Sequence, residues 1–313
     1  MFETPILFIC FNRLECTKRV FEVIRTQRPH YLYVSADGPR EEREGEKEIC
    51  NQVRKYILDN IDWNCDLRTL FRDQNLGCGK AVSSAITWFF ENVEEGIILE
   101  DDCLPASSFF KYCSELLERY RNTNYVFVIS GNNFQNKMRG SSSYYFSAYG
   151  HTWGWASWSH AWGKFKYSLD TITEFEFNKC LMDYFYTKQE RDYWNKVFIM
   201  MKYNPIDTWD FQWLFFQWLN KGISILPNTN LVSNIGFNEN ATHTFTYTDG
   251  ISAKKSFEIT SLEHPLNFQI NRKADLYTFM TVFSESEPNF FTKLSMHFNN
   301  SVFGFLSSVK SKK

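Results

Sequence analysis

The sequence predicts an α/β fold with a mixed, mostly parallel sheet that carries helices on both faces. Two observations support this prediction. Between residues 5 and 120, short apolar runs of strand length alternate four times with segments of helical periodicity, which is typical of parallel strands joined by crossover helices. Hydrophobic residues also make up 43% of the 313 residues, which is enough for a sizeable core and excludes a disordered chain.

The first half of the chain supplies these elements in order. Each expected strand is a short apolar run, and each expected helix has apolar residues on one face with charged residues between them. Pro29 ends the first helix, and Asp37–Pro39 forms a turn after the second strand. The expected strands cover residues 5–11, 31–35, 67–71, 97–99 and 125–130, and the expected helices cover 18–25, 41–58 (Ile49, Val53, Ile57 and Leu58 on its buried side), 80–90 and 107–120.

The alternation stops after residue 130. Residues 144–162 hold four tryptophans in a glycine-rich context, and amphipathic helical sequence follows to residue 201. We expect an apolar helix that ends at Leu219, a strand at 222–227 and a polar loop at 228–243. Residues 290–313 predict a helix with a basic end, which either lies on a membrane surface or packs against the body.

Composition excludes several classes of function. The formal net charge of -2 offers no general attraction to nucleic acid. The eight cysteines form no CxxC pair and have no metal-ligand spacing with histidine, so we expect reduced, mostly buried thiols in a cytoplasmic protein. The N-terminus lacks the basic region of a signal peptide, and no apolar run is long enough to span a bilayer.

One stretch, Gly96–Pro105, carries the strongest indication of chemistry. Its apolar residues predict a buried strand that runs directly into Glu100, Asp101 and Asp102. Three adjacent carboxylates at such a strand end repel one another and lose hydration, so the fold needs a cation there. Hard oxygen ligands suit magnesium or manganese, and a phosphorylated ligand held by the ion fits the same strand end. The alternative is a solvated acidic turn.

Two more polar clusters follow strands of this half. Arg13 comes just after the first strand, and Asp37 follows the second. A parallel sheet brings such strand ends to one edge, so we expect both residues to lie near Glu100–Asp102. Taken singly, Arg13 fits a surface ion pair and Asp37 a turn-forming side chain.

Six segments match a known family in the family's order, spread over residues 4–245. They are Pro5–Arg13, Val34–Asp37, Ile98–Asp102 followed by Pro105 and Phe109–Phe110, Gly154–Trp155, Trp209–Asp210 and Phe237–His243. With these segments the chain resembles glycosyltransferases of the GT-A fold, and more closely the inverting N-acetylglucosaminyltransferase I type family and its bacterial relatives. The resemblance implies a Rossmann-like sheet with helices on both faces and a C-terminal acceptor-side region.

The resemblance also implies roles at the donor side. Asp102 binds Mn²⁺ (or Mg²⁺), which bridges the diphosphate of a UDP-sugar. Asp101 and Glu100 lie near the donor, Arg13 supports the phosphates, and Asp37 accepts a hydrogen bond from the uracil. The segment Asn75–Lys80 departs from the animal enzymes of this family, so the donor sugar stays open.

The catalytic base of the family corresponds to Asp210, which takes a proton from the acceptor hydroxyl. Its alternative is a helix N-cap, because an apolar helix begins just after it, and Asp207 is another acid close by. His243 falls in a loop that in the family closes over the donor, where it either touches phosphate or metal or caps a turn.

Four residues fall where the family lines the acceptor side. Trp153 and Trp155 suit stacking on a sugar, with core packing as the alternative. Asn132 and Asn133 suit hydrogen bonds to the acceptor sugar, with turn formation as the alternative.

The whole chain is thus expected to be a metal-dependent inverting glycosyltransferase of bacterial surface polysaccharide synthesis. Its acceptor is a saccharide or a lipid-linked sugar, reached in the cytoplasm or at the inner membrane face through the C-terminal tail. We expect residues 1–135 to bind the donor, 136–250 to form the acceptor-side half of the same domain, and 251–313 to form the tail. The alternatives are a nucleotidyltransferase that makes a nucleotide sugar, which lacks its expected glycine-rich loop after the first strand, and a non-catalytic nucleotide-sugar binding protein.

Overall fold

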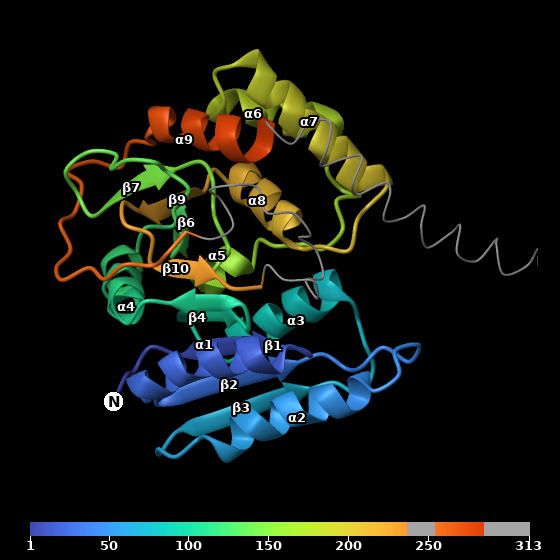
Figure 1. Ribbon diagram of the computed structural model, residues 1–313. Helices are drawn as coiled ribbons and strands as arrows, with labels where there is room; N and C mark the ends of the chain where they lie inside the picture. Colours follow the sequence, from blue (N-terminus) through green and yellow to red (C-terminus); the bar gives the residue numbers. More distant parts are fainter. Residues whose placement is uncertain (237–253, 285–313) are drawn as a thin grey trace, which may run out of the picture.

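The computed structural model describes residues 1–236 and 254–284, and it confirms the predicted alternation (Figure 1). Each of the first four strands is followed by a helix that packs back onto the sheet, with the short strand β5 inserted before α4. These elements are β1 (Ile6–Cys10), α1 (Leu14–Gln27), β2 (Tyr31–Ala36), α2 (Glu46–Asp59), β3 (Asp66–Phe71), α3 (Cys78–Phe90), β4 (Glu95–Glu100), β5 (Cys103–Pro105), α4 (Ser108–Tyr120) and β6 (Val126–Ser130).

The second half adds strands to the same sheet and a helical layer beyond it. The described elements are β7 (Tyr144–Ser147), β8 (Trp155–Trp158), α5 (Ser159–Trp162), α6 (Glu174–Tyr184), α7 (Lys188–Tyr203), α8 (Asp210–Leu219), β9 (Ile223–Pro227), β10 (Val232–Asn234), α9 (Arg272–Thr278) and the π-helical turn η1 (Phe279–Phe283). Both α6 and α7 begin with a capping box, in which a threonine and the glutamate three residues later satisfy each other's backbone N–H groups.

Eight of the described strands form one sheet in the order β3-β2-β1-β4-β8-β6-β9-β7, and β5 and β10 form a separate two-stranded sheet. Strands β1 to β4 are parallel to one another, β8 pairs antiparallel with both β4 and β6, and β6 pairs parallel with β9. The sheet is therefore mixed but mostly parallel, as expected. After β1 the chain adds β2 and β3 on one side of β1, and it then adds β4 on the other side. The order of the strands therefore switches between β1 and β4, and ligands bind at such a switch point in open α/β folds.

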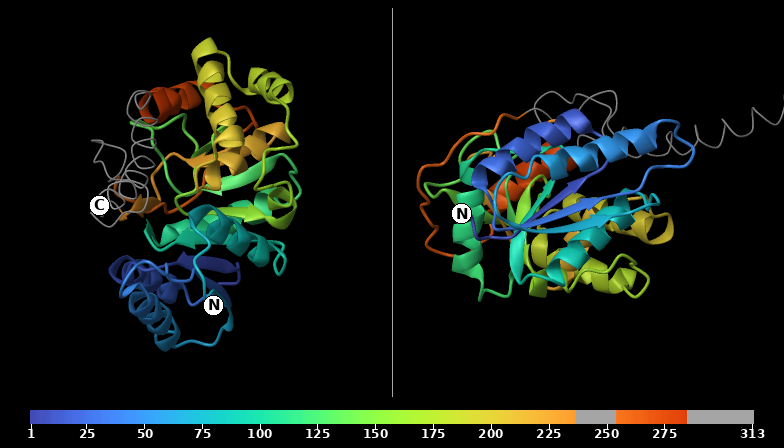
Figure 2. Two further views of the ribbon diagram at one scale, coloured as in Figure 1. Left: turned by 90° about the vertical axis from the view of Figure 1, so that its right-hand side faces the viewer. Right: turned by 90° about the horizontal axis from the view of Figure 1, so that it is seen from below.

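Helices cover both faces of the sheet, and each face has its own apolar core. On one face, α1, α2 and α4 pack against alternate residues of β1, β2 and β4. On the other face, α3, α5 and Trp213 of α8 pack against the residues between them, including Leu7 and Ile98. A third cluster joins α6, α7 and the rest of α8. Figure 2 shows this helical layer at the end of the molecule away from β1–β3.

Two sequence expectations need correction. Helix α2 begins at Glu46 rather than at residue 41, and Ile49 and Leu58 are 41% and 43% exposed. The buried side is formed instead by Cys50, Val53 and Ile57, and the buried Glu46 in the first turn pairs with Arg40. The expected polar loop at 228–243 contains strand β10, which pairs antiparallel with β5.

The described part of the tail, residues 254–284, packs against the body. The phenol oxygen of Tyr144 lies 2.9 Å from Nδ1 of His264, and the Asn271 N–H donates to the Phe146 carbonyl at 2.8 Å. The expected helix at 290–313 lies outside the described residues, so its choice between membrane and body stays a prediction. In the described segments, none of the helices has the length and apolar character that crossing a bilayer demands.

Candidate active site

The acidic stretch lies at the end of β4, and backbone hydrogen bonding to the segment after β10 fixes its position. Glu100 is the last residue of β4, and Asp101 and Asp102 form the turn into β5. The carbonyl of Asp102 accepts the N–H of Ile235 at 2.8 Å, just after β10. The chain therefore holds the acids in place at the carboxyl end of the parallel strands, where the sequence places them.

Arg13 neutralises part of this negative charge. Its guanidinium donates to Asp101 and to Oδ2 of Asp102, the latter at 2.9 Å. Burial alone would lower the pKa of Arg13, but the Asp101 and Asp102 carboxylates outweigh burial and raise that pKa above its usual value. The expected convergence of the first strand end with Glu100–Asp102 is thus present as a direct ion pair.

Glu100 has no such partner. Within the described residues its carboxylate makes no hydrogen bond and no ion pair. Burial, and then repulsion from Asp102, raises the pKa of Glu100, and Asp210 adds to the effect while Arg13 opposes it. Asp101 and Asp102 thus share one guanidinium at this strand end, and Glu100 has none, which leaves an excess of negative charge.

The donor set of this strand end fits a hard divalent cation. In the segments that the structure describes, no group of three or more histidine, cysteine, aspartate or glutamate side chains is arranged to hold a metal by itself. Mg²⁺-type ions bound with nucleotides usually take only one or two protein carboxylates, and phosphate oxygens supply other ligands. Asp102, with a side chain 16% exposed beside the unpartnered Glu100, offers ligands of this kind.

The second strand end carries Asp37, whose carboxylate accepts the backbone N–H of Leu76 at 3.0 Å. Burial raises the pKa of Asp37, and the N–H of Leu76 opposes this shift. Gly38 lies so close to the backbone of Gln74 that an added Cβ would meet it at 2.3 Å. Asp37 therefore fastens residues 74–77 to the sheet edge, and its role toward a uracil stays a prediction.

Asp207 and Asp210 have different environments although they are three residues apart. The carboxylate of Asp207 accepts the N–H groups of Cys78 and Gly79, each at 2.8 Å, and so caps the N-terminus of α3. Asp210 is the first residue of α8, is exposed, and accepts the Thr208 hydroxyl at 2.5 Å. Asp210 is thus not the N-cap that the sequence allowed, because the cap position belongs to Trp209.

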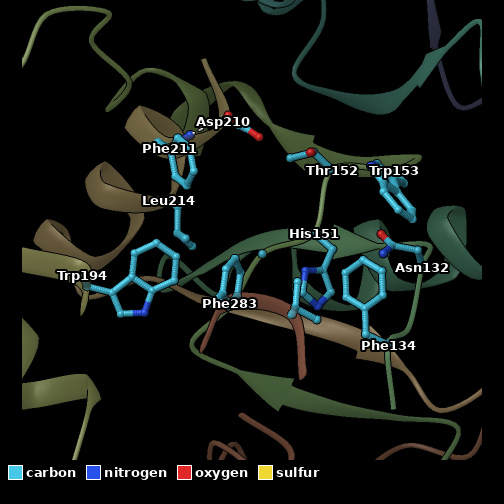
Figure 3. A pocket seen from close by; sticks show the side chains of 12 residues that line it. Asn132, Phe134, His151, Thr152, Trp153, Trp194, Asp210, Phe211, Leu214 and Phe283 are labelled. Carbon is cyan, nitrogen blue, oxygen red and sulfur yellow. Dashed lines mark hydrogen bonds between the residues drawn. The ribbon is translucent and has the colours of Figure 1, made fainter. Parts of the chain in front are cut away.

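A pocket with a cavity volume of about 150 Å³ lies beside Asp210 (Figure 3). Asn132, His151 and Thr152 give it one polar side, while the side formed by Trp194, Leu214 and Phe283 is apolar. The full set of lining residues is Asn132, Phe134, Gly150, His151, Thr152, Trp153, Trp194, Asp210, Phe211, Leu214, Val282 and Phe283. Asp210 therefore borders the pocket and also acts electrostatically on Glu100 at the acidic strand end.

Two polar side chains of this pocket lack partners. Asn132 is 2% exposed, and within the described residues neither its Oδ1 nor its Nδ2 has a hydrogen-bond partner. The same holds for Nε2 of His151, whose pKa burial lowers to about 3. Buried polar atoms are usually paired, so these atoms mark the pocket as a place prepared for a ligand.

Of the four residues expected on the acceptor side, two line the pocket and two do not. Asn132 and Trp153 line the pocket. Trp155 is 1% exposed and stacks inside the core on Trp209 at 5.8 Å, so it does not form a wall of the pocket. Oδ1 of Asn133 accepts the N–H of Gln135 at 2.6 Å, as a turn-forming asparagine does. Trp155 thus serves the core and Asn133 the turn, and His243 lies outside the described residues.

Several pocket residues carry little functional signal in the sequence. His151 and Thr152 lie in the segment between Gly150 and Trp153, whose only sequence signal is a histidine beside a glycine in an aromatic region. Phe134 follows Asn132–Asn133 and packs edge-on against His151, with ring centroids 4.7 Å apart. These residues come together only because β6 and β8 are neighbours in the sheet.

Comparisons with known proteins give partial similarities. No protein-family model matches the chain, and no curated protein matches it. The structure of the mannosyltransferase PcManGT from Pyrobaculum calidifontis, in complex with GDP-Man and Mn²⁺, aligns at 14% identity and a TM-score of 0.37, over 58% of this chain and 53% of that chain. This chain thus covers about half of the mannosyltransferase.

Two structures of HddC from Yersinia pseudotuberculosis also align. One has 11% identity and a TM-score of 0.32, over 51% of this chain and 77% of that chain. The other, complexed with GMP-PN, has 11% identity and a TM-score of 0.28, over 42% and 59%. At these identities and TM-scores the alignments add nothing to the fold, which is defined by the strands and helices of this chain.

Proposed function

We propose that the chain is a metal-dependent, inverting glycosyltransferase that moves a sugar from a UDP-sugar to a saccharide or lipid-linked acceptor, in bacterial surface polysaccharide synthesis. One observation carries the proposal: Asp210 lines the pocket and also acts electrostatically on Glu100 at the acidic strand end. Transfer of a sugar needs a site for an anionic donor next to a site for a hydroxyl acceptor, with a base between them.

On the donor side, Asp102 would hold the cation, and Arg13 would support the phosphates. A bound divalent cation offsets the negative charge that accumulates on the departing diphosphate. Arg13 is already oriented by Asp101, so its guanidinium needs little reorganisation to contact a phosphate oxygen. Glu100 and Asp101 would lie near the donor, where the bound cation and Arg13 would offset their charge.

On the acceptor side, Asp210 would take the proton from the attacking hydroxyl. The bond from the acceptor oxygen to the anomeric carbon forms as the bond to UDP breaks, and the proton ends on the Asp210 carboxylate. The Thr208 hydroxyl and the N–H of Phe211, at 2.5 and 2.9 Å, orient this carboxylate. Attack from the face opposite to UDP inverts the anomeric configuration.

The test uses the slow transfer of the sugar to water, because the acceptor is not yet known. UDP release from a panel of UDP-sugars is followed with Mn²⁺, and proton NMR identifies the anomer released first. We expect Mn²⁺-dependent UDP release, the inverted anomer, and a rate at least tenfold lower in Asp102→Asn. Asp192→Asn, an exposed acid in α7, serves as the matched control with an unchanged rate. Equal rates in Asp102→Asn and wild type, or release of the retained anomer, would contradict the proposal.

The same assay tests the two alternatives. A nucleotidyltransferase would release pyrophosphate from a nucleoside triphosphate and a sugar phosphate. In the structure, residues 11–13 lead directly from β1 into α1, without a glycine-rich loop for a triphosphate. A non-catalytic binding protein would bind UDP-sugars and release no UDP with any acceptor.

A further inference from the structure

We propose that Asn132 and His151 form a recognition site for the hydroxyl groups of one neutral sugar residue. Asn132 binds two adjacent hydroxyls of that residue, and His151 binds a third. This inference rests on the proposed function, because it assigns the pocket to the acceptor. It goes further by naming the chemistry that the pocket selects.

Two neighbouring asparagines, Asn132 and Asn133, differ in their hydrogen bonds. Both are buried, at 2% and 4% exposure. Asn133 serves the fold: its Oδ1 accepts the Gln135 N–H, and its own N–H donates to Asn230 at 2.9 Å. In the described residues the side chain of Asn132 has no such contact, although it lies at the pocket wall. The hydrogen-bonding capacity of its amide is therefore unused by the described part of the fold.

The amide group of Asn132 has a shape that suits a pair of hydroxyls. An asparagine side chain presents one acceptor and one donor next to each other in a plane. Two adjacent hydroxyls match this pair, because one donates to Oδ1 while the other accepts from Nδ2. A phosphate or carboxylate can accept from Nδ2 but leaves Oδ1 facing another negative oxygen. Asn132 therefore favours a diol over an anion.

The imidazole ring of His151 is neutral. Burial lowers the pKa of His151 to about 3, so the ring carries no positive charge near neutral pH. The Oγ of Ser130 accepts the backbone N–H of His151 at 2.9 Å, which fixes the main chain at this residue, and Phe134 packs edge-on against the imidazole ring. A neutral ring nitrogen without a partner in the described chain exchanges a hydrogen bond with a hydroxyl, and it gives no pull on an anion.

The remaining walls suit the carbon face of a sugar. Trp153 and Phe134 pack edge to face at 5.2 Å beside Asn132, while Leu214 and Phe283 lie on the other side (Figure 3). The cavity of about 150 Å³ equals the share of about five water molecules in the liquid, a volume of the order of one sugar residue.

The geometry also separates recognition from reaction. Asp210 belongs to α8, whereas Asn132 follows β6, and Figure 3 shows them on different sides of the pocket. The hydroxyl that reacts at Asp210 is therefore a different one from the two held by Asn132. Removal of either hydroxyl of the diol should weaken binding while the reacting hydroxyl stays in place.

The experiment measures sugar binding without donor and without metal, so that it does not depend on the donor chemistry. The full chain is titrated with methyl glycosides of glucose, galactose and mannose and with their monodeoxy analogues, and binding is followed by saturation-transfer NMR. We expect at least one glycoside to bind, to lose at least tenfold in affinity when either of two adjacent hydroxyls is removed, and to bind better than glucose 6-phosphate.

Three variants separate recognition from folding. Asn132→Leu should bind the glycoside at least tenfold more weakly while keeping or raising the melting temperature, because it removes unpaired buried atoms. Asn133→Leu, the matched control, should lower the melting temperature because its amide is used by the turn. His151→Phe keeps a ring of similar shape and should also weaken sugar binding.

The outcomes are distinguishable from a failure of the proposed function. If the protein binds a UDP-sugar but no glycoside, or if Asn132→Leu lowers the melting temperature as much as Asn133→Leu does, the inference is wrong and the donor proposal stands. If a glycoside binds through Asn132 but no UDP-sugar binds with Mn²⁺, the donor proposal fails and the sugar pocket stands. Equal or stronger binding of the phosphorylated sugar would also contradict the inference.

Discussion

The turns that follow β4 and β6 lie at the same edge of the sheet, but they handle polar groups in opposite ways. After β4, charged side chains gather, and Arg13 partly neutralises them. After β6, the side chains are uncharged, and within the described residues Asn132 is left without partners. The difference teaches that a strand end can be prepared for a ligand either by unbalanced charge or by unfilled hydrogen-bonding capacity.

The largest effect is expected at Asp210, which lines the pocket and acts electrostatically on Glu100. Asp210→Asn keeps the size of the side chain but removes the base, so the rate of UDP release in the presence of an acceptor should fall about 10²- to 10⁴-fold. The affinities for the UDP-sugar and for the glycoside should change by less than about twofold, since Asp210 binds neither tightly. If Asp210→Asn keeps most of the wild-type rate of UDP release, Asp210 is not the base, and the proposed functional connection between the two turns is wrong.

Arg13→Met tests the charged region alone. The substitution leaves Asp101 and Asp102 without their cation, so we expect a loss of about 2–4 kcal/mol in the free energy of unfolding, measured in urea at neutral pH. Added Mn²⁺ should restore part of this stability in Arg13→Met. Unchanged stability would show that the acids do not repel one another strongly, contrary to our account.

Asp275 offers a buried carboxylate of a third kind, because its partners are neutral. Oδ1 accepts the Ser147 hydroxyl at 2.5 Å and Oδ2 accepts the Ala148 N–H at 2.9 Å, which joins α9 to β7. Burial raises the pKa of Asp275 to about 7, although these two hydrogen bonds oppose the shift. The folded chain therefore holds this proton up to a higher pH than the unfolded chain, whose aspartates titrate near pH 4.

Stability should consequently fall as the pH rises from about 4 to 7 and level off above that, by about 2–4 kcal/mol from this residue. In Asp275→Asn this fall should be absent, as measured by urea unfolding at a series of pH values. A fall of the same size in the variant and in wild type would assign the pH dependence to other groups.

The smallest effect is expected at Asp207. Asp207→Ala removes the acceptor of the Cys78 and Gly79 N–H groups, so the chain should lose about 1 kcal/mol of stability, as at other helix N-termini. Thermal unfolding monitored by circular dichroism measures the loss. Asp170→Ala, an exposed acid that caps no helix start, is the control, and equal changes in both variants would exclude the capping role.

Much of the sheet could be predicted from sequence because its strands are buried on both faces and therefore read as continuous apolar runs. The meeting of Arg13 with Asp101 and Asp102 was likewise predictable in outline, since parallel strands share one edge. The side of α2 that is buried was not, because Ile49 and Cys50 are adjacent, and a shift of one residue, which is about 100° around the helix, decides which of them is buried.

The pocket could be predicted least. Its polar wall joins Asn132 to His151 across two neighbouring strands, a contact that no local pattern reports. Adjacent asparagines look the same in sequence, and only the hydrogen bonds of Asn133 reveal which of them serves the turn. Trp155 shows the same limit, because burial against Trp209 cannot be read from its position beside Trp153.

The most direct test of the central claim is calorimetric titration of the wild-type chain and of Asp102→Asn with a UDP-sugar, with and without Mn²⁺, with Asn132→Leu as the control. Our account predicts Mn²⁺-dependent binding that is at least tenfold weaker in Asp102→Asn and unchanged in Asn132→Leu. Binding that does not depend on Mn²⁺, or that is equally strong in Asp102→Asn and in wild type, would contradict it.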